Sequence, residues 1–107
     1  MSSSIRHIVM WRLRGQTSEE RSAARLKVKT LFESLKGRID GLTHIEVGLD
    51  ISDVDYACDV VLFSEFTDSA ALKAYAIHPE HLRVREELGD LRIGRFQVDY
   101  PIKETGA

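Results

Sequence analysis

The sequence predicts an α+β protein of ferredoxin-like type, with elements in the order βαββαβ and one four-stranded antiparallel sheet that carries its helices on one face. Three observations predict this fold class. Four segments alternate apolar and other residues as strands do, two apolar stripes have helical spacing, and Gly and Pro residues separate them. A chain of 107 residues is too short for two stable cores. We therefore expect a single domain over 1–107, with an ordered core at about 5–102 and a frayed tail.

The chain begins with an expected strand at 5–14. Its helix-facing side is apolar except for His7, because alternate residues of a strand point to opposite faces. A helix is expected over 18–36, where apolar residues recur at helical spacing. Thr17 is a suitable N-cap, and Glu20 three residues later completes a capping box.

The middle of the chain predicts two neighbouring strands, at 42–51 and 56–66, joined by a polar turn. The alternation of the second strand places Cys58 on its helix-facing side, packed as a small hydrophobe. Asp68 follows as the expected N-cap of the next helix.

The last third predicts two short helices and a final strand. Pro79 ends a helix at 69–77 and suits the first turn of another that runs to about Leu88. The final strand is expected at 93–102.

The face of the sheet opposite the helices is expected to be mixed. Apolar side chains sit there among polar ones: Ile8, Met10, Leu42, Val61 and Phe63 among Arg6, Arg12, His44, Glu46, Asp59, Arg95, Gln97 and Asp99. A contiguous apolar patch on a small protein often marks an interface. We therefore expect a homodimer in which two sheets pack face to face as a barrel, with twofold symmetry.

Composition narrows the class of protein. The net charge is −2 and the basic residues form no stripe, so we expect no nucleic-acid partner. The single cysteine excludes an intramolecular disulfide and suits a reducing compartment. Neither a signal peptide nor an apolar run long enough to span a membrane is present, so we expect no membrane partner and a cytoplasmic location.

Histidines and one tyrosine are the candidate functional residues. His7 would be buried, either as a core histidine bonded to a backbone carbonyl or as part of a site. His81 shares a helical stripe with apolar residues and should point at the sheet. His78 could cap the following helix, and Tyr75 lies one turn before it.

His7, Tyr75 and His81 could approach one apolar region between the sheet and the junction of the two short helices, which is typical of a small-molecule site. A histidine there could move protons, and a tyrosine hydroxyl could hold a carbonyl or enolate oxygen. His78 and His81 have no adjacent third ligand, so we expect no metal, and no organic cofactor is implied.

Three segments, 5–11, 41–48 and 72–81, resemble the stress-responsive dimeric α/β-barrel family. The His78-Pro-Glu-His81 segment is the most specific of them. The resemblance covers nearly the whole chain and implies a ferredoxin-like protomer and a homodimer. Most members have no assigned activity, but one plant member, olivetolic acid cyclase, closes a linear polyketide by an aldol reaction without a cofactor.

Similarity to that cyclase implies roles for five residues. His81 takes the place of the catalytic base, and Tyr75 that of the pocket tyrosine. His7 matches a histidine that lines the same pocket, His78 matches the first histidine of the motif, and Cys58 stands where the cyclase has a further pocket histidine. We expect these three residues to bind the substrate.

Three functions remain open. The first is binding of a small, mostly apolar, carbonyl-bearing molecule, with cofactor-independent acid–base chemistry of the cyclase or lyase kind. The second is a non-catalytic stress-related or scaffold dimer without a cavity beside His7 and Tyr75. The third is a cofactor-free monooxygenase, which would need a substrate that stabilises its own carbanion.

Overall fold

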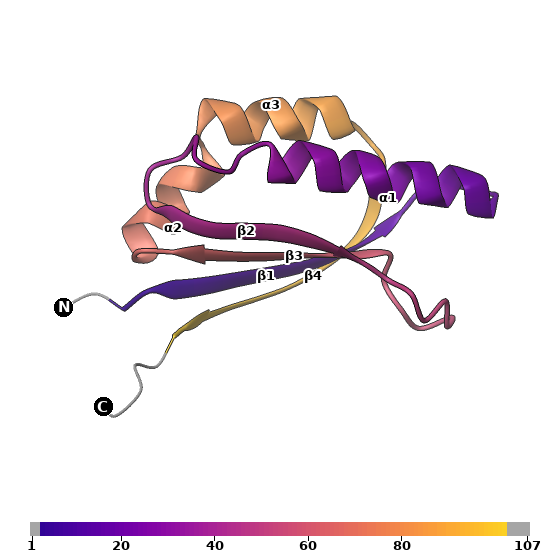
Figure 1. Ribbon diagram of the computed structural model, residues 1–107, viewed down its shortest axis with the longest axis horizontal. Coiled ribbons are helices and arrows are strands. Elements are labelled where there is room, and N and C mark those ends of the chain that lie inside the picture. The colour runs from indigo at the N-terminus through magenta and orange to yellow at the C-terminus, as the bar shows by residue number, and fades with distance from the viewer. Residues whose placement is uncertain (1–2, 103–107) are drawn as a thin grey trace.

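The computed structural model describes residues 3–102, so the expected tail at 103–107 lies outside them. Seven elements follow one another: β1 (Ile5–Leu13), α1 (Ser18–Glu33), β2 (Leu42–Leu49), β3 (Val60–Phe66), α2 (Ser69–Ala76), α3 (Pro79–Leu88) and β4 (Arg92–Pro101). The strands form one antiparallel sheet in the order β2-β3-β1-β4. All three helices lie on one face of it (Figure 1). The ferredoxin-like fold predicted from the sequence is confirmed.

The core lies between the sheet and the helices. Val9, Trp11 and Leu13 of β1 are buried, as the alternation predicts. Trp11 stacks on Phe32 of α1 with 5.0 Å between the ring centroids, and Val28 packs one turn before it. Burial of these apolar side chains on one face fixes how each element faces the sheet.

Local hydrogen bonds begin the helices where the sequence predicts. The Thr17 hydroxyl accepts a hydrogen bond from the backbone N–H of Glu20 at 3.0 Å, and the Glu20 carboxylate reaches back to the N–H of Gln16 at 2.8 Å. The Asp68 carboxylate accepts from the N–H of Ala71 at 2.8 Å. These bonds satisfy N–H groups that have no partner within the helix.

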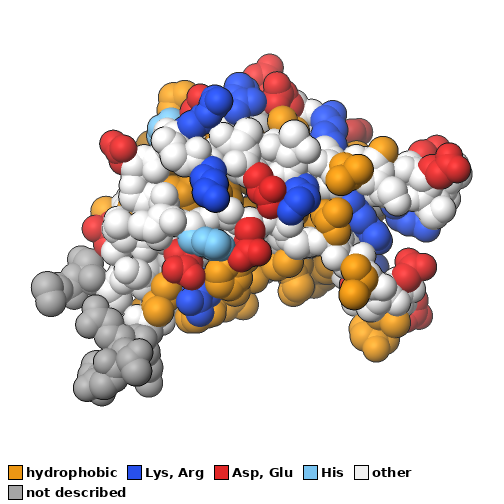
Figure 2. All heavy atoms as spheres, in the orientation of Figure 1, with side chains coloured by type: hydrophobic (Ala, Val, Ile, Leu, Met, Phe, Trp, Pro, Cys, Tyr) orange, Lys and Arg blue, Asp and Glu red, His pale blue; other side chains and the backbone are white. Residues whose placement is uncertain are grey.

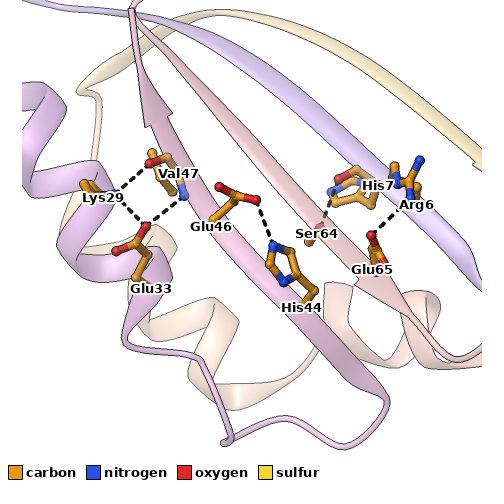
Figure 3. A network of polar contacts seen from close by, with 9 residues as sticks. All are labelled: Arg6, His7, Lys29, Glu33, His44, Glu46, Val47, Ser64 and Glu65. Atoms are coloured by element: carbon orange, nitrogen blue, oxygen red, sulfur yellow. Dashed lines mark hydrogen bonds and ion pairs between the residues drawn. The ribbon is translucent and has the colours of Figure 1, made fainter.

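Strand β2 forms one edge of the sheet, and α1 occupies the backbone groups at its centre. Lys29 donates to the carbonyl of Val47 at 2.9 Å, and Glu33 accepts from the N–H of Val47 at 3.0 Å. Lys29 and Glu33 also form an ion pair at 2.8 Å (Figure 3). The helix therefore supplies the partners that a further strand would otherwise provide.

The faces of β4 are the reverse of those expected. Asp99 pairs with His7 and Gln97 with Val9, so the polar residues of β4 lie on the helix side of the sheet. Its apolar residues, Phe96 and Val98, lie on the open face and are more than half exposed. The physical reason is that the helices pack mainly over the other three strands, which leaves the helix side of β4 in contact with water.

The open face is consequently more apolar than the sequence predicts. Cross-strand pairing brings six apolar residues together on this face: Ile8, Met10, Val61, Phe63, Phe96 and Val98. Figure 2 shows hydrophobic side chains along the side of the molecule away from the helices. Leu42 leaves this face, because an irregularity between Leu42 and His44 turns it towards the core.

The connection between β2 and β3 is longer than expected. Asp50 accepts hydrogen bonds from the Ser52 hydroxyl at 2.8 Å and the N–H of Asp53 at 2.9 Å. Asp53 has a φ of 54°, so the chain turns away from extended geometry there. Strand β3 begins at Val60. Cys58 therefore precedes the strand, and alternation does not fix its direction.

Candidate functional site

A pocket of about 630 Å³ lies on the helix side of the sheet, between β1, β4 and the α2–α3 junction. His7, Tyr75 and His81 all line it, as the sequence predicts. Its apolar lining includes Trp11, Phe32, Leu62 and Leu72, and polar side chains of β4 also line it. A mostly apolar hollow with a few polar groups is the usual form of a small-molecule site.

His81 is placed to accept a proton. Its Nδ1 lies 3.3 Å from the carbonyl oxygen of Ala76 at the end of α2. A carbonyl oxygen only accepts, so Nδ1 carries the hydrogen and Nε2 keeps its lone pair in the neutral ring. Burial lowers the pKa of His81 overall, and the nearby positive charges of Arg85 and Arg92 add to that effect. This environment favours the neutral form of the ring.

Tyr75 lies against His81 with 4.2 Å between the ring centroids. The residue is 3% exposed, and its buried hydroxyl has no hydrogen-bond partner among the described residues. Burial raises the pKa of this hydroxyl above its usual value, although Arg92 and Arg95 oppose the effect. The group thus stays protonated as a donor, and leaving it unpaired costs about 1–3 kcal/mol.

His7 is held by a carboxylate from the neighbouring strand. Its Nδ1 lies 2.5 Å from Asp99 Oδ1, and the second oxygen of Asp99 accepts from Gln97 at 3.0 Å. The backbone carbonyl of His7 accepts from the buried Ser64 hydroxyl at 3.0 Å (Figure 3). The ring is 6.1 Å from that of Tyr75. These contacts fix the orientation of the imidazole through its Nδ1.

Two expected site residues do not reach this pocket. His78 caps α3, because its Nδ1 accepts from the N–H of Glu80 at 3.0 Å, and it is absent from the pocket wall. Cys58 lines a different pocket of about 480 Å³ beside Met10 and Val61, on the open face of the sheet. The strand expected from 56 begins only at Val60, so Cys58 lies in the loop before β3, which explains its displacement.

Sequence reasoning missed Asp99 and Arg92 as pocket residues. The alternation of the last strand predicts Asp99 on the open face, whereas antiparallel pairing of the first and last strands sets it across from His7. Arg92 begins β4 one residue before the expected strand. Its guanidinium lies over the Trp11 ring, 4.9 Å from the centroid.

The described part of the chain offers neither a cluster of metal ligands nor a membrane-spanning helix. No group of three or more His, Cys, Asp and Glu side chains within residues 3–102 could hold a metal ion. Over the same residues, no helix has the length and apolar character needed to cross a membrane.

Fold and site together define an α+β protein with a ferredoxin-like sheet, an apolar open face and a histidine–tyrosine pocket under the helices. The family model of the stress responsive A/B barrel domain matches residues 5–102. The chain belongs to this family. An uncharacterized protein of Streptomyces coelicolor is 34% identical over 77 residues, which are 72% of this chain and 78% of that protein.

Solved structures agree with this assignment. A dimeric protein of unknown function with a ferredoxin-like fold from Bacteroides fragilis is 32% identical, with a TM-score of 0.82, over 92% of this chain and 96% of that one. A hydroxynitrile lyase from Passiflora edulis has a TM-score of 0.75 at 19% identity and full coverage of both chains. At that identity the lyase shows likeness of fold alone.

Proposed function

We propose that this chain is a homodimer whose pocket binds a small, mostly apolar, carbonyl-bearing molecule and moves a proton on it without a cofactor. His81 acts as the base, and Tyr75 holds the carbonyl oxygen. The observation that carries this proposal is the unpaired, buried hydroxyl of Tyr75 beside a neutral histidine in one pocket. A ligand oxygen would remove the cost of leaving that hydroxyl unpaired.

The proton transfer follows from the two ring environments. His81 Nε2 is free to take a proton from the carbon next to the carbonyl, because Nδ1 is committed to Ala76. The resulting enolate oxygen would be stabilised by the Tyr75 hydroxyl, whose raised pKa keeps its hydrogen in place. His7, oriented by Asp99, is the neighbouring binding group.

The homodimer is supported by the open face of the sheet. Met10, Phe96 and Val98 are 42%, 54% and 61% exposed in the single chain, and they lie on neighbouring strands. The Bacteroides fragilis neighbour with the same fold is dimeric. Covering this face with a second copy would bury those side chains away from the pocket, which lies on the helix side.

Hydrogen exchange tests the catalytic part directly. Acetophenone in deuterated water loses its methyl proton signal when a base forms the enolate, and NMR follows the rate. We expect the wild-type protein to accelerate exchange, His81→Ala to reduce the acceleration by roughly a hundredfold or more, and Tyr75→Phe to reduce it less. His44→Ala is the matched control, because His44 pairs with Glu46 outside the pocket.

A folded His81→Ala protein that exchanges as fast as the wild type would contradict this role. The non-catalytic scaffold instead predicts that losing His81 lowers thermal stability and leaves ligand binding unchanged. Oxygen consumption with quinol-like compounds would favour the monooxygenase. The pocket beside His7 and Tyr75 supports the first of the three functions over the scaffold.

A further inference from the structure

Three arginines line the same pocket as Tyr75 and His81. Arg85 follows His81 by one helical turn on α3, and Arg92 and Arg95 come from β4. Arg92 is the most enclosed of them, with its guanidinium 4.9 Å from the centroid of Trp11 and 5.9 Å from that of Phe32. Stacking on aromatic faces covers the plane of a guanidinium and leaves its N–H edge available for bonding.

The positive charges of these arginines are not matched by acidic groups. None of the three forms an ion pair with a carboxylate within residues 3–102, whereas Arg6 and Arg25 do. Asp99 is the acidic residue among the lining side chains, and both of its oxygens are taken, by His7 and by Gln97. The lining of the pocket therefore holds an excess of positive charge.

Mutual repulsion of the three arginines makes this arrangement costly. Burial lowers the pKa of Arg92, and the charges of Arg95 and Arg85 lower it further. The positive charges of Arg85 and Arg92 also lower the pKa of His81, whose largest cause of lowering is burial. A group of negative charge placed against Arg92 would relieve the repulsion at both positions.

We propose that the ligand is an oxo acid: its carboxylate binds Arg92, supported by Arg85 and Arg95, while its carbonyl meets Tyr75 and His81. The two oxygens of a carboxylate match the fork of a guanidinium, and the apolar wall takes the rest of the molecule. This inference rests on the proposed function and adds the substrate class to it.

Two probe molecules separate the contribution of the carboxylate charge to binding from that of the carbonyl group. Phenylpyruvate carries both groups, and its neutral amide, phenylpyruvamide, keeps the ring and the carbonyl without the charge. We expect calorimetry to show that the wild-type protein binds the acid at least tenfold more tightly than the amide. Added salt should weaken binding of the acid more than that of the amide.

Arg92→Met removes the charge and keeps an apolar stem on Trp11. We expect this variant to lose about tenfold or more in affinity for phenylpyruvate and to bind phenylpyruvamide as the wild type does. Arg21→Met is the matched control, since Arg21 lies on α1 outside this pocket, and it should leave both affinities unchanged.

Equal affinity of the wild type for the two probes would overturn the oxo-acid inference, and so would an acid-to-amide ratio that Arg92→Met leaves unchanged. The proposed function would stand in that case if Tyr75→Phe weakened binding of both probes. Failure of the wild-type protein to bind either probe would refute the inference and the proposed function together.

Discussion

Replacing Tyr75 by phenylalanine should make the protein more stable. The substitution keeps the ring, whose centroid lies 5.0 Å from that of Phe66 and 4.2 Å from that of His81, and removes only the hydroxyl. That hydroxyl is buried without a partner among the described residues. Because an unpaired buried hydroxyl costs about 1–3 kcal/mol, we expect the free energy of unfolding of the ligand-free protein to rise by roughly 1 kcal/mol.

Urea denaturation of wild type and Tyr75→Phe measures this difference. The protein concentration is held constant, because dimer formation adds a concentration-dependent term to stability. For a chain of this size, 1 kcal/mol corresponds to a shift of roughly 4–8 °C in Tm. Tyr100→Phe is the matched control: its hydroxyl accepts from Arg6 at 3.0 Å, so its loss should be neutral or destabilising.

A loss of 1 kcal/mol or more in Tyr75→Phe would refute the reasoning, because it would show that the hydroxyl is already bonded in the ligand-free protein. The expected gain carries a functional cost. The same variant should exchange the protons of acetophenone more slowly. A residue that lowers stability and raises activity is a common mark of a functional site.

Three further predictions concern the fold and the assembly. Gly41→Ala should destabilise the protein by about 2 kcal/mol more than Gly37→Ala, as measured by urea denaturation. Both glycines have a positive φ, so both substitutions strain the backbone. A Cβ at Gly41 would in addition lie 2.5 Å from the Cβ of Ala71, whereas one at Gly37 would meet nothing within 4 Å. Equal losses would contradict the close approach. Burial opposes ionisation of Glu33, but its bonds to α1 and β2 hold the pKa of this carboxyl below the ordinary value. The ionised carboxylate therefore stabilises the fold at pH values above the pKa of the unfolded state. This stabilisation is lost as the pH falls through the pKa of the folded state. Glu33→Gln should remove that part of the acid sensitivity, seen as a flatter dependence of Tm on pH between about 5 and 3. Val98→Asp should convert the dimer to a folded monomer by light scattering, whereas an unchanged mass would exclude the open face as the interface.

The elements that alternation and capping define could be predicted from sequence. Val9 and Trp11 are buried where the period of a strand places them, and Thr17 caps α1. These signals are local, because a side chain's face depends on its own strand and a cap depends on residues three positions away.

The arrangement of the edge strand could not be predicted in the same way. Alternation divides β4 into two faces but does not say which one the helices cover. The apolar face is therefore expected to pack against the core, whereas Phe96 lies on the open face and Asp99 reaches His7. Cys58 was misplaced for a related reason, since the hydrogen bonds of Asp50 that lengthen the preceding loop carry no periodic signal.

The contacts of α1 with Val47 also limit how large the assembly can become. Edge-to-edge growth into a fibre requires two edges that can each accept a neighbouring molecule. In the middle of β2 both backbone groups of Val47 are committed to Lys29 and Glu33, so that edge is closed to further strands there. The ion pair of Lys29 and Glu33 therefore disfavours edge-to-edge growth through the middle of β2.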